Sequence, residues 1–507
     1  MKRFLRKALR WTAILLAILG ALLLVFYAEE DWRGTRDWAT CQRDLAAKGE
    51  TLDLRQLIPP GNPTDDLSKA PIFQEMYRAE QDYEQARKAK SSPNGLITGM
   101  VDNLVQAETR MDRLKIDLGS NDRSKIPKLA DYRKGESTDL AAWQKFFHSN
   151  LKAHLPSENG TAPDDVLRTL RQFDPELNET DSAVSNPNAY WPHNYDMPFQ
   201  EYLGAVTSMI DVAKILQLRA TAYLENKQMD LAEKDYLFSF RLCQPLTRGP
   251  FYVHYLVIAA VRTIDDSILW EGLRRHVWND TQLHEMESAL ASTDMVALAA
   301  QTLRNNRASF LKAMDVAQTV DTISFRRLKA GNWFFPPESA IYRPLGWWNQ
   351  DRCIYSRGTQ RDIEGLDLEH ETLSTVPFLH SEIPRSGPGD NPNLWSHIYI
   401  PMSAHDLPVV DSMSSSIARA ETYRRLARLA CRLEEYRLAH NNQYPEKLDD
   451  LPDLPAHLNQ EVLSEQPLHY QRKGDGYLLY SLGWNQKDDG GAYSTDAKEG
   501  DWPWPSP

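Results

Sequence analysis

The densest group of side chains that could do chemistry is an acidic run between residues 362 and 371. Its five carboxylates are Asp362, Glu364, Asp367, Glu369 and Glu371. Paired carboxylates can act as general acid and base or hold a metal ion, but a run of this density is more typical of a solvated surface. We favour the solvated surface and keep the reactive site as the alternative.

Catalytic motifs are missing from the rest of the sequence. It has no HExxH, no GxSxG, no phosphate-binding glycine loop and no dinucleotide fingerprint. None of its 13 histidines lies three or four residues from another, so paired histidine ligands on one helical face are missing. We therefore predict no catalytic residue and no cofactor from local motifs, although distant loops can still assemble a site.

Aromatic residues crowd the segment from 331 to 410, which is also rich in proline and glycine. They are Trp333, Phe334, Phe335, Tyr342, Trp347 and Trp348. Exposed rings could stack on sugars or lie at a membrane surface, but large aromatic side chains supply much of a core's buried area. Burial is the favoured interpretation. Exposed rings would instead suit an envelope hydrolase or a carbohydrate-binding protein, which is the alternative function.

The four cysteines, Cys41, Cys243, Cys353 and Cys431, are far apart in the sequence and form no CxxC pair. In an oxidising compartment they could form two disulfides with three possible connectivities. They fit buried free thiols equally well, and the sequence leaves both options open.

The chain of 507 residues has an ordinary globular composition, with 42% apolar and 25% charged residues. This composition excludes a wholly disordered chain and a protein with many membrane spans. The formal net charge is −12, although five basic residues stand in the first ten positions. We predict no nucleic-acid partner, because the acidic remainder has no basic excess to displace phosphate counterions.

The strongest signal is an uncharged stretch from Trp11 to Ala28, between the basic N-terminus and three acidic residues. A helix of this length spans about 27 Å, close to the roughly 30 Å of a bilayer's hydrocarbon core. A cleaved signal peptide is the competing interpretation, but Phe26 stands where its cleavage site needs a small residue. We predict a single-pass signal anchor in the bacterial inner membrane, with residues 11–28 in the lipid. By the positive-inside rule the N-terminus is cytoplasmic and the bulk of the chain is periplasmic.

The remainder is predicted to be mainly α, with an extracytoplasmic helical bundle and a small C-terminal α+β module. Changes of composition divide the chain into residues 1–28, the basic flank and transmembrane anchor; 29–198, helices and loops; 199–330, the helical bundle; 331–410, the irregular aromatic region; and 411–507, the C-terminal module. A helix is expected over residues 31–48, with Gly49 as its stop. Two breaks, at 57–63 and 186–198, are rich in proline and asparagine and interrupt the helical pattern.

The helical signal is strongest after residue 200. Apolar residues recur every three or four positions from Val206 to Tyr223 and again from Ala232 to Cys243, which predicts a helical hairpin. The hairpin has tetratricopeptide-repeat offsets, but without a second copy an ordinary all-α bundle is favoured over a peptide-binding solenoid. Another helix is predicted to begin after Asn279, which can cap it while Gln282 bonds back.

The C-terminal module has the pattern of a long helix followed by a hairpin. Leucines at 426, 429 and 433 form one stripe of a helix over 412–440. Residues 468–472 and 477–482 are strand-like and flank the turn sequence KGDG.

These elements resemble the globular part of the major pseudopilins of type II secretion. The resemblance is carried by residues 433–438 with Gln443-Tyr444-Pro445, then by Tyr480-Ser481-Leu482-Gly483, Asp489-Gly490-Gly491 and Asp501-Trp502. It implies a long helix laid across a small antiparallel sheet, with a calcium ion in the loop after the last strand. The N-terminal apolar helix departs from that family, because it contains no acidic residue.

The pseudopilin resemblance makes Asp488, Asp489, Asp496 and Asp501 candidate calcium ligands. Calcium takes about six to eight oxygen ligands, which carboxylates and loop carbonyls supply. Asn485-Gln486 stands where the pseudopilin pattern has Asp-Gly, and aspartates in such a loop can instead make tight turns. Calcium is the one cofactor that the sequence suggests, with tight turns as the alternative.

Over its full length the chain also resembles an uncharacterised family of bacterial membrane-anchored proteins. The matching residues are Asp31-Trp32-Arg33-Gly34, Ala47-Lys48-Gly49-Glu50, Leu57-Ile58-Pro59-Pro60, Trp270-Glu271-Gly272-Leu273 and Trp484-Asn485 with Asp488-Asp489-Gly490-Gly491. This resemblance implies no activity. The expected role is a non-enzymatic structural or protein-interaction component of the bacterial envelope, with another envelope protein as its partner.

Overall fold

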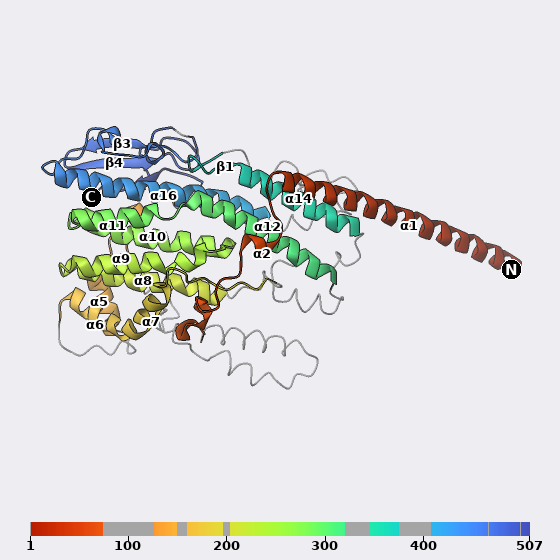
Figure 1. Cartoon of the computed structure of the whole chain (residues 1–507), viewed down its shortest axis with the longest axis horizontal. Coiled ribbons are helices and arrows are strands. Elements are labelled where there is room, and N and C mark those ends of the chain that lie inside the picture. The colour runs from red at the N-terminus through yellow and green to blue at the C-terminus, as the bar shows by residue number, and fades with distance from the viewer. Residues whose placement is uncertain are drawn as a thin grey trace.

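A computed structural model, 66% of which is helix, describes residues 2–74, 126–149, 160–195, 203–319, 345–374, 407–464, 466–496 and 498–506. One helix, α1, projects far beyond a body of packed helices (Figure 1). The prediction of a mainly helical chain with a long apolar N-terminal helix and small antiparallel sheets is confirmed.

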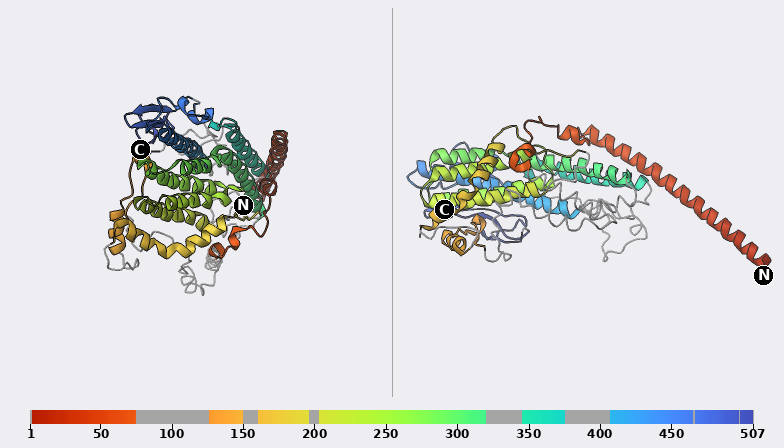
Figure 2. Two further views of the ribbon diagram at one scale, coloured as in Figure 1. Left: turned by 60° about the vertical axis from the view of Figure 1, so that its left-hand side comes forward. Right: turned by 90° about the horizontal axis from the view of Figure 1, so that it is seen from below.

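Helix α1 runs without a break from Lys2 to Ala47. Its most apolar 18-residue window has no residue buried in the protein, and the right-hand view of Figure 2 shows the helix extending away from the body. Leu24, for example, is 73% exposed, which is unfavourable in water and favourable in lipid. By length and composition, α1 can therefore cross a membrane. The separate helix expected over 31–48 is the outer part of α1, and Gly49, with a φ of 77°, follows its end.

The body consists of helices that differ widely in length. They are α2 (Leu54–Leu57), α5 (Leu140–Ser149), α6 (Ala162–Leu170), α7 (Asp174–Val184), α8 (Leu203–Glu225), α9 (Met229–Leu242), α10 (Tyr252–Arg274), α11 (Asp280–Ala291), α12 (Met295–Thr319), α14 (Leu345–Glu364) and α16 (Leu407–Ala439). Helix α10 contacts α8, α9, α12 and α16, and α11 lies along α16. These long helices run roughly parallel to the long axis of the body (Figure 1).

One cluster of buried apolar side chains extends through the body and includes residues from Leu67 to Trp504. The Trp278 indole packs on Gly272, where an added Cβ would lie 2.1 Å from the ring, and its Nε1 donates to the Leu269 carbonyl at 3.0 Å. The Trp270 Nε1 donates to the carbonyl of Pro505 at 3.1 Å. The C-terminal residues are thus attached directly to α10.

The start of α11 follows from local sequence. Asn279 Oδ1 accepts the backbone N–H of Gln282 at 3.0 Å, and Gln282 Oε1 accepts the backbone N–H of Asn279 at 3.2 Å. This reciprocal capping box satisfies two donors that the helix itself leaves unpaired. The predicted start after Asn279 is confirmed, and Leu283, Met286 and Leu290 are buried.

A three-stranded antiparallel sheet lies against α16. Its strands β3 (His469–Lys473), β4 (Gly476–Ser481) and β5 (Trp502–Trp504) follow one another in the order β3-β4-β5. The β3–β4 turn uses Gly474 at a φ of 57°, which glycine adopts without a Cβ penalty. Both tryptophans of β5 are buried and belong to the main core cluster. A second, two-stranded sheet pairs β1 (Leu366–Asp367) with β2 (Thr372–Leu373) after the end of α14.

Candidate functional site

The outer part of α1 packs against α14 immediately after the apolar stretch ends. Glu30, which is 5% exposed, accepts hydrogen bonds from Trp347 Nε1 at 2.9 Å and from Arg33 at 2.7 Å. Asp31 Oδ1 accepts the backbone N–H of Gly346 at 2.8 Å, and so satisfies a donor in the first turn of α14. These two carboxylates attach the body to α1.

Of the aromatic residues singled out in the 331–410 segment, two lie among the described residues and four do not. Trp347 and Trp348 lie on α14 and are buried, as favoured, with 8% and 3% of their surface exposed. The Trp347 ring meets Phe26 of α1 edge to face, with centroids 6.1 Å apart. Trp333, Phe334, Phe335 and Tyr342 lie outside the described residues.

The acidic run is split between the last turn of α14 and the β1–β2 hairpin. Glu364 and Glu369 are exposed as expected, but Asp362 is only 2% exposed. Among the described residues neither of its carboxylate oxygens has a hydrogen-bond partner, and burial raises its pKa to about 7. The solvated-surface interpretation is therefore wrong for Asp362, because the helical phase turns this position inward while Arg361 and Glu364 face water.

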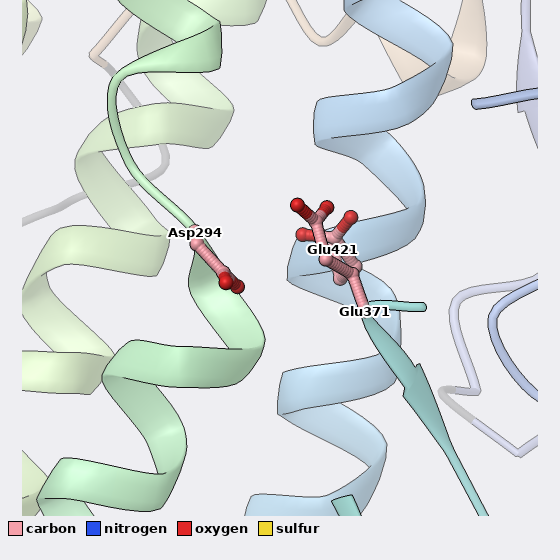
Figure 3. Close-up of side chains that lie close together, drawn as sticks. All are labelled: Asp294, Glu371 and Glu421. Atoms are coloured by element: carbon pink, nitrogen blue, oxygen red, sulfur yellow. The ribbon is translucent and has the colours of Figure 1, made fainter. Parts of the chain in front are cut away.

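Three carboxylates from separate elements meet beside α16. Asp294, Glu371 and Glu421 each place one oxygen within 4.8 Å of the others (Figure 3). Within the described ranges, no other group of three or more such ligand atoms lies this close together. Sequence reasoning singled out only Glu371, because the three residues are distant in the chain.

Two arginines pair with two of these three carboxylates. Arg424 donates to both Glu421, at 2.8 Å, and Glu371, and Arg425 donates to Glu421 at 2.9 Å. Burial would raise the pKa of Glu421, but the two guanidinium groups hold it below its usual value. Asp294 accepts two backbone N–H groups at the start of α12. We assign the group to ion pairing that joins α16 to the hairpin, since Glu421 and Glu371 are paired with arginine and Asp294 accepts backbone N–H groups.

The aspartates predicted as calcium ligands organise the loop before β5. Asp501 is fully buried, and its Oδ2 accepts the backbone N–H groups of Asp489 at 3.1 Å and Gly491 at 2.6 Å. Asp488 Oδ1 accepts the backbone N–H of Gly490 at 2.9 Å. Such carboxylate-to-backbone bonds are those that tight turns use.

The fourth predicted ligand, Asp496, lies in its own turn and accepts the backbone N–H of Lys498 at 3.0 Å. No three of these four aspartates bring ligand oxygens within 4.8 Å of one another. Two of the four are in direct contact, because the backbone N–H of Asp489 donates to the carboxylate of Asp501. Calcium binding in this loop stays a prediction.

A cleft of about 380 Å³ opens where the two proline-rich and asparagine-rich breaks meet. Residues 57–65 form one wall, and Tyr190 and Tyr195 belong to the other. The walls are joined by backbone hydrogen bonds from Tyr190 to Asp65 and from Leu67 to Tyr190, both 3.1 Å long. Gly61 allows this contact, because an added Cβ would lie 2.3 Å from the Tyr190 ring.

Arg248 and Gly249 close one side of the cleft. Arg248 donates to the carbonyls of Pro187 and Asn188, while Gly249, at a φ of 89°, packs on Ile58. Asn62, Asn188 and Gln301 also line the cleft, together with one acidic and one basic residue, Asp65 and Arg248. Since the two charges offset each other, tyrosines combined with amides suit a neutral polar ligand, whose apolar face stacks while its hydroxyls form hydrogen bonds.

The sequence revealed both walls of this cleft only as breaks in the helical pattern. It gave no signal that they pair, because their contacts join residues more than a hundred positions apart. Comparison of the chain with protein-family models, with curated proteins and with solved structures gave no match.

The calcium hypothesis predicts a higher melting temperature in millimolar calcium than in EDTA, because a ligand that binds only the folded state stabilises it. Differential scanning fluorimetry of the full chain measures this difference. Asp488→Asn should abolish the shift, whereas Asp475→Asn in the exposed β3–β4 turn should preserve it. Equal melting temperatures in the two buffers would leave tight turns as the role of the loop aspartates.

Asp362→Asn should stabilise the protein at high pH. The pKa of Asp362 is raised from 3.8 to about 7 in the folded state. The contribution of Asp362 to the free energy of unfolding is therefore greatest below pH 3.8 and is lost as the pH rises towards 7. We expect a gain in unfolding free energy on the order of 2 kcal/mol at pH 8 and a smaller gain at pH 5. Urea unfolding at both pH values measures it.

The matched control is Asp367→Asn, five residues further on. A hydrogen bond from His370 lowers the pKa of Asp367, so its replacement should give no gain at pH 8. An equal effect of Asp362→Asn at pH 5 and pH 8 would contradict a raised pKa at that position.

Proposed function

We propose that this protein is a single-pass protein of the bacterial inner membrane, with a cytoplasmic N-terminus and a periplasmic body. The body serves as a non-enzymatic structural or protein-interaction component of the envelope. The observation that carries the proposal is the exposed apolar surface of α1, which has no cover in the described part of the protein.

The ends of the apolar stretch support this placement. Trp11 is 71% exposed and Trp32 is 64% exposed, so one tryptophan stands near each end of residues 11–28. Tryptophan is enriched at both membrane–water interfaces, where its ring is apolar and its N–H is polar. The basic residues precede the first tryptophan, which favours the cytoplasm for that end.

The continuity of α1 supports a role in holding the body close to the membrane. The same helix passes from the apolar stretch into the contact with α14, without a linker between them. Phe26 lies within the apolar stretch and meets Trp347 of the body. The start of α14 would therefore lie at the level of the lipid headgroups.

We also propose a helical bundle over residues 199–330 and a pseudopilin-like module over 411–507. The module proposal is supported by the contacts of α16 with β4 and β5 and by the buried tryptophans of β5. A long helix packed on a small antiparallel sheet buries one face of each element. Such a module presents its remaining faces to an envelope partner.

Reporter fusions after Pro507 test the placement. We expect alkaline phosphatase, which folds outside the cytosol, to be active and green fluorescent protein to be dark. A variant without residues 2–28 should leave the membrane fraction, since the remaining chain lacks the apolar stretch. Activity of the C-terminal reporter only in the cytosol would overturn the proposal.

A second candidate function is binding of a neutral saccharide in the cleft between residues 57–65 and 188–195. The favouring observation is the position of Tyr195, which lines the cleft and whose ring is covered by the Arg55 guanidinium, 4.8 Å from the ring centroid. Aromatic rings stack on the C–H faces of sugars, while amides and hydroxyls bind the sugar oxygens. Trp347 and Trp348 of the aromatic tract are buried, so we place the proposed carbohydrate site in this cleft.

Tyr195→Ala should weaken binding of a soluble oligomer of N-acetylglucosamine about tenfold, the loss expected when one stacking contact is removed. Isothermal titration calorimetry with the full chain in detergent measures the affinity. Tyr195→Phe keeps the ring and should bind nearly as well, and Tyr436→Ala on α16 should bind like the parent protein. No heat of binding with the parent protein would remove this candidate.

A further inference from the structure

Two segments that are more than 300 residues apart carry the same spacing of a glycine and a cysteine. Gly34 is followed by six residues and Cys41 on α1, and Gly346 is followed by six residues and Cys353 on α14. Seven residues are close to two helical turns, so each cysteine lies on the same face of its helix as the glycine.

The two helices run parallel, so these positions correspond. Contacts between them advance in the same direction along both chains, in the sequence Glu30 with Trp347, Thr35 with Asn349, Cys41 with Cys353, Asp44 with Arg357 and Lys48 with Glu364. The glycine pair lies near the start of this contact, and the cysteine pair lies two turns further on.

The glycines set a short distance between the helices. A Cβ added to Gly34 would lie 2.1 Å from the Gly346 carbonyl oxygen, and one added to Gly346 would lie 1.8 Å from the Glu30 carbonyl oxygen. Only residues without a side chain permit such an approach. Side chains as small as cysteine therefore meet directly two turns later.

The two cysteines belong to one small apolar cluster, and each thiol lies against the backbone of the other helix. Cys41 Sγ is 3.9 Å from the Cys353 carbonyl oxygen, and Cys353 Sγ is 4.0 Å from the Asp37 carbonyl oxygen. Cys41 is fully buried and Cys353 is 4% exposed, beside Leu45. The neighbouring Cys353 side chain lowers the pKa of Cys41, while the Cys41 side chain and burial raise the pKa of Cys353.

The other two cysteines have different surroundings. Cys243 and Cys431 belong to the main core cluster of the body, and both are fully buried. Burial raises the pKa of Cys243 to about 12 and also raises the pKa of Cys431. They lie in a different cluster from Cys41 and Cys353, so these two cysteines should stay free.

We propose that Cys41 and Cys353 form a disulfide that covalently joins the anchor helix to α14. In the cell this rests on the proposed periplasmic location, where disulfides persist. The oxidant is a disulfide-bearing molecule: the Cys41 thiolate attacks one of its sulfurs and releases one oxidant thiolate. The Cys353 thiol then loses its proton, and the resulting thiolate attacks the Cys41 sulfur and releases the second oxidant thiolate. The two cysteines lose two electrons and two protons, and the oxidant becomes two thiols.

The test uses the purified full chain in detergent, equilibrated with oxidised and reduced glutathione and then trapped with acid. Mass spectrometry of unreduced peptides should find Cys41 linked to Cys353. Labelling with a polyethylene glycol maleimide after denaturation should count two free thiols before reduction and four after it. Cys353→Ala should give three labels under both conditions.

A melting curve tests the consequence for stability. Reduction should lower the melting temperature of the parent protein and leave that of the Cys41→Ala, Cys353→Ala double variant unchanged, because the cross-link closes a long loop in the unfolded chain. Four free thiols after equilibration, or a link to Cys243 or Cys431, would overturn the inference. The glutathione experiment does not depend on location, so the reporter fusions can fail while this inference stands, and the reverse.

Discussion

The structure depends on whether the apolar surface of residues 11–28 faces lipid or water. None of that stretch is buried in the protein. Exposing its leucines and isoleucines to water would cost a large amount of free energy. In the proposed membrane, every backbone N–H and C=O of the stretch must be satisfied within the segment, so a helix is the conformation that a single span can adopt. Nothing in the sequence breaks this helix before Gly49, and it therefore continues into the body.

Because α1 continues into the body, the residues just outside the apolar stretch have two roles. Glu30 and Asp31 mark the end of the uncharged sequence, and they also bind Trp347 and the first turn of α14. Gly34 then lets the two helices approach within backbone contact. A short sequence thus ends the apolar stretch and fixes the helix that lies beside α1, so the orientation of the body follows from the path of α1.

Features set by neighbouring residues could be predicted from the sequence, and features set by distant contacts could not. The capping box at Asn279 and the strands on either side of Gly474 are local, and both were predicted close to their observed bounds. The cleft required residues 57–65 to pair with residues 188–195, and neither break carries a signal for the other. The position of Asp362 was predicted wrongly because its acidic neighbours suggested a solvated face, while helical phase decides which carboxylate turns inward.

Buried arginines explain how irregular segments keep their places in such a body. Arg425 is fully buried and donates to Glu421 and to the carbonyls of His370, Glu371, His457 and Gln460, so one side chain joins two loops to α16. Arg307 does the same beyond the end of α1, where it binds Glu50 and also Gln360 of α14.

Desolvation offsets much of the attraction in a buried ion pair, so such pairs add little net stability. Their effect is on geometry, because an alternative loop position would leave a buried guanidinium without acceptors. The apolar core therefore supplies the stability of the body, and the arginines select one arrangement of the loops around it.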